Sequence, residues 1–170
     1  QVIDSGIKVL KIEGRGRAAD YVATVIKTYR EAIDSYYEGT FTKEKINTWM
    51  EALATVYNRG FWSGYYLGQK LGEWSDNPGS NATQKKVYVG KGMHYFPKSS
   101  IAEFKIEAYD IKKGDKILIT GPSTGAQELI LEDFFVNDVT SEKATKGDSC
   151  TLKVPFRIRL SDKMYKIVEN

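Results

Sequence analysis

The chain has 170 residues, of which 41% are hydrophobic, and its 25 Lys and Arg against 22 Asp and Glu leave a formal net charge of +3. This composition is typical of a chain that buries a core, and it excludes intrinsic disorder. The sequence has no run of about eighteen apolar residues, so it excludes a membrane-spanning helix and predicts no membrane partner.

A strand is the first predicted element, over residues 7–12. Four of these six residues are apolar, three of them β-branched, and two glycines then end the run. A helical pattern follows and completes a β/α unit, in which ligands usually bind at the carboxyl end of the strand. The first residues lack a signal-peptide pattern, and Gln1 is not an initiator methionine. We therefore expect the chain to begin inside a longer protein and the strand to be the edge of a larger sheet.

Four charged residues surround the end of this strand. Alternation places Lys11 and Glu13 on one face, and Arg15 and Arg17 follow at the start of the helix, where backbone N–H groups favour an anion. The pattern predicts a ligand site for a small carboxylate or phosphate, formed by Lys11, Glu13, Arg15 and Arg17. The alternative is an internal network of Lys11, Glu13 and Arg15 that only fixes the turn.

Two helices follow, over residues 18–38 and 42–58, because apolar residues recur there three and four positions apart. Gly39 supplies a stop for the first helix, and Thr42 is a suitable N-cap for the second. Glycines then recur among aromatic residues over residues 59–68, a pattern that favours close packing.

A polar segment without apolar periodicity, residues 72–85, indicates a linker between a first domain over residues 1–71 and a second over residues 86–170. The second domain is predicted to be all-β, because short alternating runs recur at the regular spacing of a small barrel. Gly114 and Gly147 each precede a strand, where a positive φ begins a turn. The predicted strands cover residues 86–92, 100–109, 115–120, 126–136, 150–156 and 163–168.

Basic, imidazole and aromatic side chains mix over residues 91–98. Such a mixture can stack on a nucleotide and contact its phosphate. Residues 80–170 also hold the whole charge excess, with 15 Lys and Arg against 12 Asp and Glu. The alternative is a structural histidine beside a proline turn. The pattern predicts weak, salt-sensitive RNA binding through Lys91, His94, Tyr95, Phe96 and Lys98.

The sequence offers few candidate residues for metal binding or nucleophilic catalysis. A single cysteine, Cys150, excludes an intrachain disulfide, and a single histidine, His94, cannot build a zinc site alone. No catalytic triad, metalloprotease motif or phosphate loop can be assembled. We therefore expect a reducing, cytoplasmic setting, no metal site in this chain, and no catalytic residue that the sequence identifies.

Three ordered blocks carry a family resemblance. Leu-Lys-Ile-Glu-Gly-Arg at residues 10–15 is followed by Tyr-Val-Ala-Thr-Val at 21–25 and Tyr-Arg-Glu-Ala-Ile-Asp at 29–34. The second block covers residues 89–98, and the third covers residues 113–122. Together they resemble the collagenase-like peptidase family U32, the last two blocks being similar to its carboxyl-terminal region. The resemblance covers almost the whole chain.

The resemblance implies an α+β architecture. It comprises the terminal β/α unit and helices of a truncated α/β barrel, then a small all-β barrel that resembles the second domain of elongation factor Tu. The partner of the first part would be the missing N-terminal part of the same barrel. The family's Arg-Gly-Phe implies that Arg59 and Phe61 line a ligand site, against an alternative role in packing.

Three functions remain open from this resemblance. The family name implies a peptidase of unknown mechanism that acts on a peptide partner. Some relatives are instead implicated in hydroxylating pyrimidines of tRNA or rRNA. A non-enzymatic module that binds RNA or protein is the third reading. An iron–sulfur cluster or metal would be held upstream of this chain, which alone would be inactive.

Overall fold

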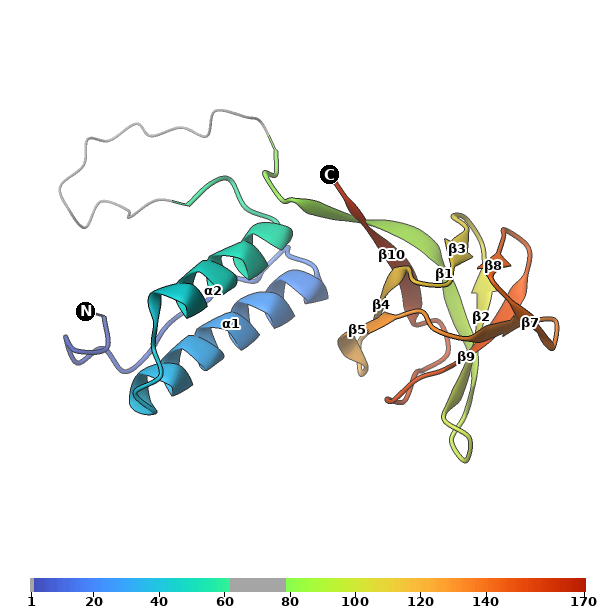
Figure 1. Ribbon diagram of the computed structural model, residues 1–170, viewed down its shortest axis with the longest axis horizontal. Helices are drawn as coiled ribbons and strands as arrows, with labels where there is room; N and C mark the ends of the chain where they lie inside the picture. Colours follow the sequence, from blue (N-terminus) through green and yellow to red (C-terminus); the bar gives the residue numbers. More distant parts are fainter. Residues whose placement is uncertain (1, 62–78) are drawn as a thin grey trace. The chain divides into compact units, whose positions relative to one another are not determined.

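The computed structural model describes residues 2–61 and 79–170 (Figure 1). The chain forms two compact units, Gln1–Leu53 and Ala54–Asn170. The first is built on helices and the second on an antiparallel sheet, which confirms the predicted α+β class. The predicted linker lies partly outside the described residues, so the domain boundaries stay a prediction.

Helix α1 (Ala19–Tyr37) matches its predicted range to within one residue at each end. Asp20 in the first turn complements the partial positive charge of the helix N-terminus. The helix ends where Gly39 takes a φ of +71°, and the N–H of Thr40 then reaches the carbonyl of Ser35 at 2.8 Å. The predicted glycine stop is therefore confirmed.

Helix α2 (Lys43–Thr55) begins at the predicted N-cap. The Thr42 hydroxyl accepts the N–H of Lys45 at 3.3 Å, as an N-cap does. Trp49 is buried and packs against Phe41, with ring centroids 5.2 Å apart. The helix ends three residues before the predicted end. In the described part of the chain, no helix has the length and apolar character needed to cross a membrane.

The strand predicted over residues 7–12 is not formed. A β-strand is defined by hydrogen bonds to a neighbouring strand, and the described residues offer this segment no such neighbour. Its apolar side chains are consequently open to solvent, with Val9 82% and Ile7 53% exposed. The strand prediction was wrong for this chain because it rested on residue type alone.

The second unit is an antiparallel sheet of eight strands in the order β5-β4-β10-β1-β2-β9-β6-β7, with a separate β3-β8 pair (Figure 1). Core side chains from most of these strands form one cluster, with Phe104, Phe134 and Met164 fully buried. The strands are β1 (Gln84–Phe96), β2 (Ile101–Ile106), β3 (Ile111–Lys112), β4 (Lys116–Gly121), β5 (Gly125–Ile130), β6 (Phe134–Val136), β7 (Val139–Ser141), β8 (Lys143–Ala144), β9 (Ser149–Lys153) and β10 (Lys163–Glu169).

The six predicted strands are recovered, with one division. The predicted strand over residues 126–136 separates into β5 and β6, because Leu131 turns into the core and its N–H bonds the carbonyl of Asp115 at 2.8 Å. Gly114 and Gly147 take φ of +88° and +101°, which confirms the two predicted turns. The likeness to the second domain of elongation factor Tu stays a prediction.

Strand β1 is the longest of the sheet and changes neighbour along its length (Figure 1). Its first part, from Gln84 to Lys91, pairs with β10, and its second part, from Gly90 to Phe96, pairs with β2. The register shifts once in each ladder. These two bulges decide which β1 side chains point away from the core.

Candidate functional site

The predicted ligand turn is fixed by Glu13 and two glycines. The Glu13 carboxylate accepts the backbone N–H of Arg15 at 2.8 Å, and the N–H of Arg17 bonds the carbonyl of Gly14 at 2.9 Å. Gly16 takes a φ of +73°, the positive angle that the third residue of a type II turn requires. The Glu13 bond that holds the turn therefore uses the backbone of Arg15 and not its guanidinium.

All four charged residues predicted for this site are exposed: Lys11, Glu13, Arg15 and Arg17. The guanidinium of Arg17 lies 5.9 Å from the ring centroid of Tyr21, a cation–π contact. A Cβ added at Gly14 would lie 3.0 Å from Val22 Cγ2, so the turn packs closely against α1. The structure thus places the four residues on one short, solvent-reachable segment, and their ligand role stays a prediction.

Arg59 and Phe61 fall in the second compact unit. The Arg59 Nε donates to the Tyr57 hydroxyl at 2.8 Å, and Phe61 is 51% exposed. Neither residue is packed in a core, so the packing alternative gains no support from the described residues. Their place in a ligand site stays a prediction.

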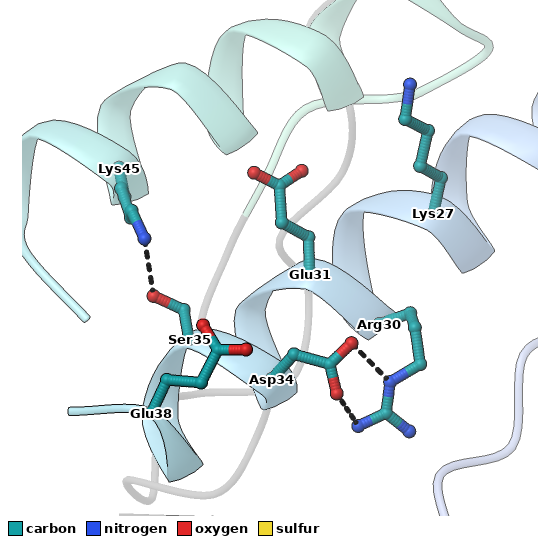
Figure 2. Close-up of a pocket in the computed structure, with 7 residues that line it drawn as sticks. All are labelled: Lys27, Arg30, Glu31, Asp34, Ser35, Glu38 and Lys45. Atoms are coloured by element: carbon teal, nitrogen blue, oxygen red, sulfur yellow. Dashed lines mark hydrogen bonds and ion pairs between the residues drawn. The ribbon is translucent and has the colours of Figure 1, made fainter. Parts of the chain in front are cut away.

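A shallow hollow of about 470 Å³ lies between α1 and α2 (Figure 2). The Arg30 and Asp34 side chains pair across one helical turn at 2.6 Å, and Lys45 Nζ donates to Ser35 Oγ at 3.0 Å. Three basic and three acidic residues balance in its lining, so the hollow has no net preference for a charged ligand. The lining consists of Lys27, Arg30, Glu31, Asp34, Ser35, Glu38 and Lys45.

The outward face of β1 gathers basic and aromatic side chains. Alternate residues of a strand share a face, and each bulge adds one residue to that spacing. Gln84 also lies on this face, and its basic and aromatic residues are Lys86, Tyr88, Lys91, His94 and Phe96. We call these five residues the β1 platform.

Glu107 holds two members of the β1 platform in place. Its carboxylate accepts the Tyr88 hydroxyl at 2.5 Å and pairs with Lys91 Nζ at 2.9 Å. The Tyr88 hydrogen bond, followed by the Lys91 contact, holds the pKa of Glu107 below its ordinary value. Burial, followed by the Glu107 hydrogen bond, raises the pKa of Tyr88 to about 12. Tyr88 is therefore a neutral donor at physiological pH.

The hairpin end of the β1 platform is an exposed ring pair. The His94 and Phe96 centroids lie 4.4 Å apart at 60°, and Phe96 is 44% exposed. Tyr95 points the other way and packs against the core, so it cannot present its ring with them. Lys98 is exposed in the turn that follows. Three of the five residues predicted for RNA thus share one face: Lys91, His94 and Phe96.

Comparison with known proteins places the chain in a family. Residues 1–76 match the model described as peptidase family U32. A protein of Porphyromonas gingivalis named collagenase is 50% identical over 166 residues, which cover 98% of this chain and 40% of that protein. The chain belongs to peptidase family U32. An uncharacterized protease of Methanocaldococcus jannaschii is 34% identical to this U32 chain, over 99% of the chain and 41% of that protein.

More distant relatives of this U32 chain carry another name. The tRNA hydroxylation protein P1 of Bacillus subtilis is 30% identical over 124 residues, which cover 72% of this chain and 29% of that protein. The crystallised C-terminal domain of a U32 family protein of Geobacillus thermoleovorans matches with 19% identity and a TM-score of 0.44, over 46% of this chain and 96% of that domain. The chain spans less than half the length of these curated relatives.

Cys150 does not fit a metal or cluster ligand in the U32 chain. It is fully buried, and burial is the main cause that raises the pKa of its thiol to about 12. Metals bind the thiolate, which such a site disfavours. Within the described ranges, no three His, Cys, Asp or Glu side chains gather as a metal site would need.

Sequence reasoning missed part of the outward surface around β1. Tyr88 and Tyr165 stack edge to face at 5.7 Å, and Lys163 and Lys105 lie directly opposite Lys91 on β10 and β2. For Tyr88 the signal was the glycine pattern of β1, whereas the residues on β2 and β10 follow from strand pairing, which has no local signal. Gly90 and Gly92 lie beside the two bulges. Because each bulge adds one residue, odd-numbered and even-numbered residues of β1 share one face.

Proposed function

We propose that this chain is the carboxyl-terminal part of a collagenase-like U32 peptidase, whose catalytic residues lie outside it. The observation that carries the proposal is 50% identity, over 98% of the chain, to a protein named collagenase. The chain spans 40% of that relative, so we expect it to be inactive on peptides without the rest of the protein.

In this proposal the turn around Arg15 contributes to the substrate site of the whole protein. The apolar residues before the turn favour a missing neighbouring strand, because Val9 is 82% and Ile7 is 53% exposed. Burying such side chains contributes about 25 cal/mol per Å². A neighbouring strand from the longer protein would bury them and bring the exposed charges of Lys11 and Arg15 to the end of the sheet.

The test uses the full-length parent, assayed for cleavage of gelatin and of a fluorogenic collagen peptide. We expect cleavage by the parent, none by the 170-residue chain, and a large loss in the parent carrying Arg15→Lys. Lys loses the bidentate geometry of a guanidinium while it keeps the charge. Lys27→Gln, on the charge-balanced hollow, is the matched control and should keep full activity. A folded parent that cleaves neither substrate would refute the proposal.

RNA modification is the second candidate, favoured by the β1 platform together with the 30% identity to a tRNA hydroxylation protein. A cluster or metal for that chemistry would need ligands outside this chain, since Cys150 does not fit one. The test is mass spectrometry of tRNA and rRNA nucleosides from cells with and without the parent gene. Loss of a hydroxylated pyrimidine would support this function, and an unchanged nucleoside profile would exclude it.

A further inference from the structure

A row of three lysines crosses the sheet beside the β1 platform. Lys91 of β1 lies directly opposite Lys163 of β10 on one side and Lys105 of β2 on the other. The row continues to Thr120 on β4 and to Ser149 on β9, so it has no acidic member at either end. Residues directly opposite in a sheet have Cβ atoms about 5 Å apart, and like charges there are destabilising.

Contacts in the structure offset only part of the repulsion among these lysines. In the described part of the chain, Lys91 is the member of the row that forms an ion pair, with Glu107. Lys105 Nζ donates to the carbonyl of Gly147, which is uncharged. Glu103 lies in the next row, opposite His94. Because opposed lysines destabilise the sheet, the row does not serve folding stability. Binding of an external anion explains it better.

The aromatic rings lie on the same face as the lysine row. His94 and Phe96 follow Lys91 along β1, and Tyr88 precedes it, with Tyr165 alongside on β10. Strand β1 has 13 residues, which at a rise of about 3.3 Å each is roughly 40 Å of surface. That length suits a chain of several nucleotides, the size of site found in small β-barrels that bind single strands.

We propose that the β1 platform, with Lys105 and Lys163, binds single-stranded RNA. The lysine row would contact phosphates, and the exposed His94 and Phe96 rings would stack on bases. The proposal commits to single strands because a duplex keeps its bases stacked and hides their faces from side chains. An acidic peptide would satisfy the lysines but would leave the rings without a partner.

The inference rests on the second proposed function for its substrate class, but it is tested separately. Binding is measured on the 170-residue chain without turnover. If the chain binds RNA but the parent leaves the nucleosides unchanged, only the proposed modification activity is excluded. If the chain does not bind RNA but the parent modifies it, only the binding role of the β1 platform is excluded.

The experiment is fluorescence anisotropy with a fluorescein-labelled 12-nucleotide oligouridylate at several salt concentrations. Stacking is worth about 1–3 kcal/mol per base, so Phe96→Ala should weaken binding roughly fivefold or more. Lys105→Gln and Lys163→Gln should each lower the slope of log K against log salt by about 0.7, the value for one single-strand phosphate contact. Matched controls are Tyr109→Ala, at an exposed tyrosine off the platform, and Lys146→Gln, at an exposed turn lysine.

The outcomes separate RNA recognition from charge alone. Weaker binding for the platform variants, unchanged binding for the controls, and poor competition by a 12-base-pair duplex and by polyglutamate support the proposal. Absence of binding at low salt overturns it. So does a Phe96→Ala variant that binds as tightly as the wild type, or equal competition by polyglutamate. Phe96 and Lys163 are exposed and Lys105 is partly buried, and thermal melts confirm that each variant is folded.

Discussion

Adding one methyl group at Gly121 should destabilise the sheet unit through the buried carboxylate of Asp162. Asp162 is 1% exposed, and its Oδ2 accepts the N–H of Arg159 at 2.8 Å and the Thr124 hydroxyl. These bonds tie the chain before β10 to the β4–β5 turn. A Cβ added at Gly121 would lie 1.8 Å from Asp162 Oδ1 and 2.5 Å from its Cγ. Gly121→Ala therefore expels the carboxylate.

The magnitude follows from the bonds that this displacement breaks. A hydrogen bond to a charged group contributes about 1.5–3 kcal/mol, so the loss of two costs roughly 3–6 kcal/mol. Asp162→Ala should cost a similar amount, because it removes the same acceptor and leaves the N–H of Arg159 without its partner. Domains of this size have about 5–15 kcal/mol of stability in total. Either change alone should therefore bring the sheet close to unfolding.

The two substitutions should not add. In an Asp162→Ala background the space beside Gly121 is empty, so Gly121→Ala should then cost under about 1 kcal/mol, a coupling of about 2 kcal/mol or more. The assay is hydrogen exchange with mass spectrometry on peptides from β4 and β10, in increasing urea, because the two units of the chain need not unfold together. Additive losses would refute the reasoning, since they would show that the methyl group and the carboxylate do not compete for one space.

Three further outcomes are expected. Subtracting the ultraviolet titration of Tyr88→Phe from that of the wild type should leave one tyrosine with a midpoint near pH 12. Because folding raises the pKa of Tyr88 above the ordinary value of 10.0, wild-type stability should fall as the pH rises from about 10 to 12. Tyr88→Phe should lose less stability over this range, and equal losses would contradict the assignment. In the 170-residue chain, Arg15→Lys should leave the melting temperature unchanged, whereas Glu13→Ala should increase amide exchange in the turn, and the reverse pattern would show that the guanidinium supports the fold. Limited proteolysis should cut within residues 72–86 and leave a stable β core, and rapid loss of that core would place the boundary elsewhere.

Local signals predicted the helices and most strands. The stop at Gly39 and the cap at Thr42 depend on residue type and spacing within a few positions, and both are formed as predicted. The alternation of β2 is likewise complete, with every second side chain buried. Such features need no knowledge of distant parts of the chain, because the physical cause lies in the segment itself.

Features that depend on a distant partner could not be predicted in the same way. Residues 7–12 have the composition of a strand, yet a strand also needs a neighbour, and composition does not supply one. The break between β5 and β6 has a similar origin, since Leu131 leaves the ladder to bond Asp115, sixteen positions earlier in the chain. Asp162 was not singled out because a lone acid near the end of a barrel pattern has no sequence signature of burial.

The candidate RNA surface shows the same limit at the scale of one residue. Strict alternation along β1 would place Lys91, Met93 and Tyr95 together, whereas the structure groups Lys91 with His94 and Phe96. The difference is the register shift after Gly92, where an added Cβ would lie 2.8 Å from Ile158 Cδ1. Close packing at this glycine accompanies the bulge, and the bulge turns the imidazole outward and the Tyr95 ring inward. The structure thus keeps Lys91, His94 and Phe96 on one face and turns Tyr95 toward the core. The RNA-binding role of the set stays a prediction, and alternation alone could not place the bulge that separates Tyr95 from the other rings.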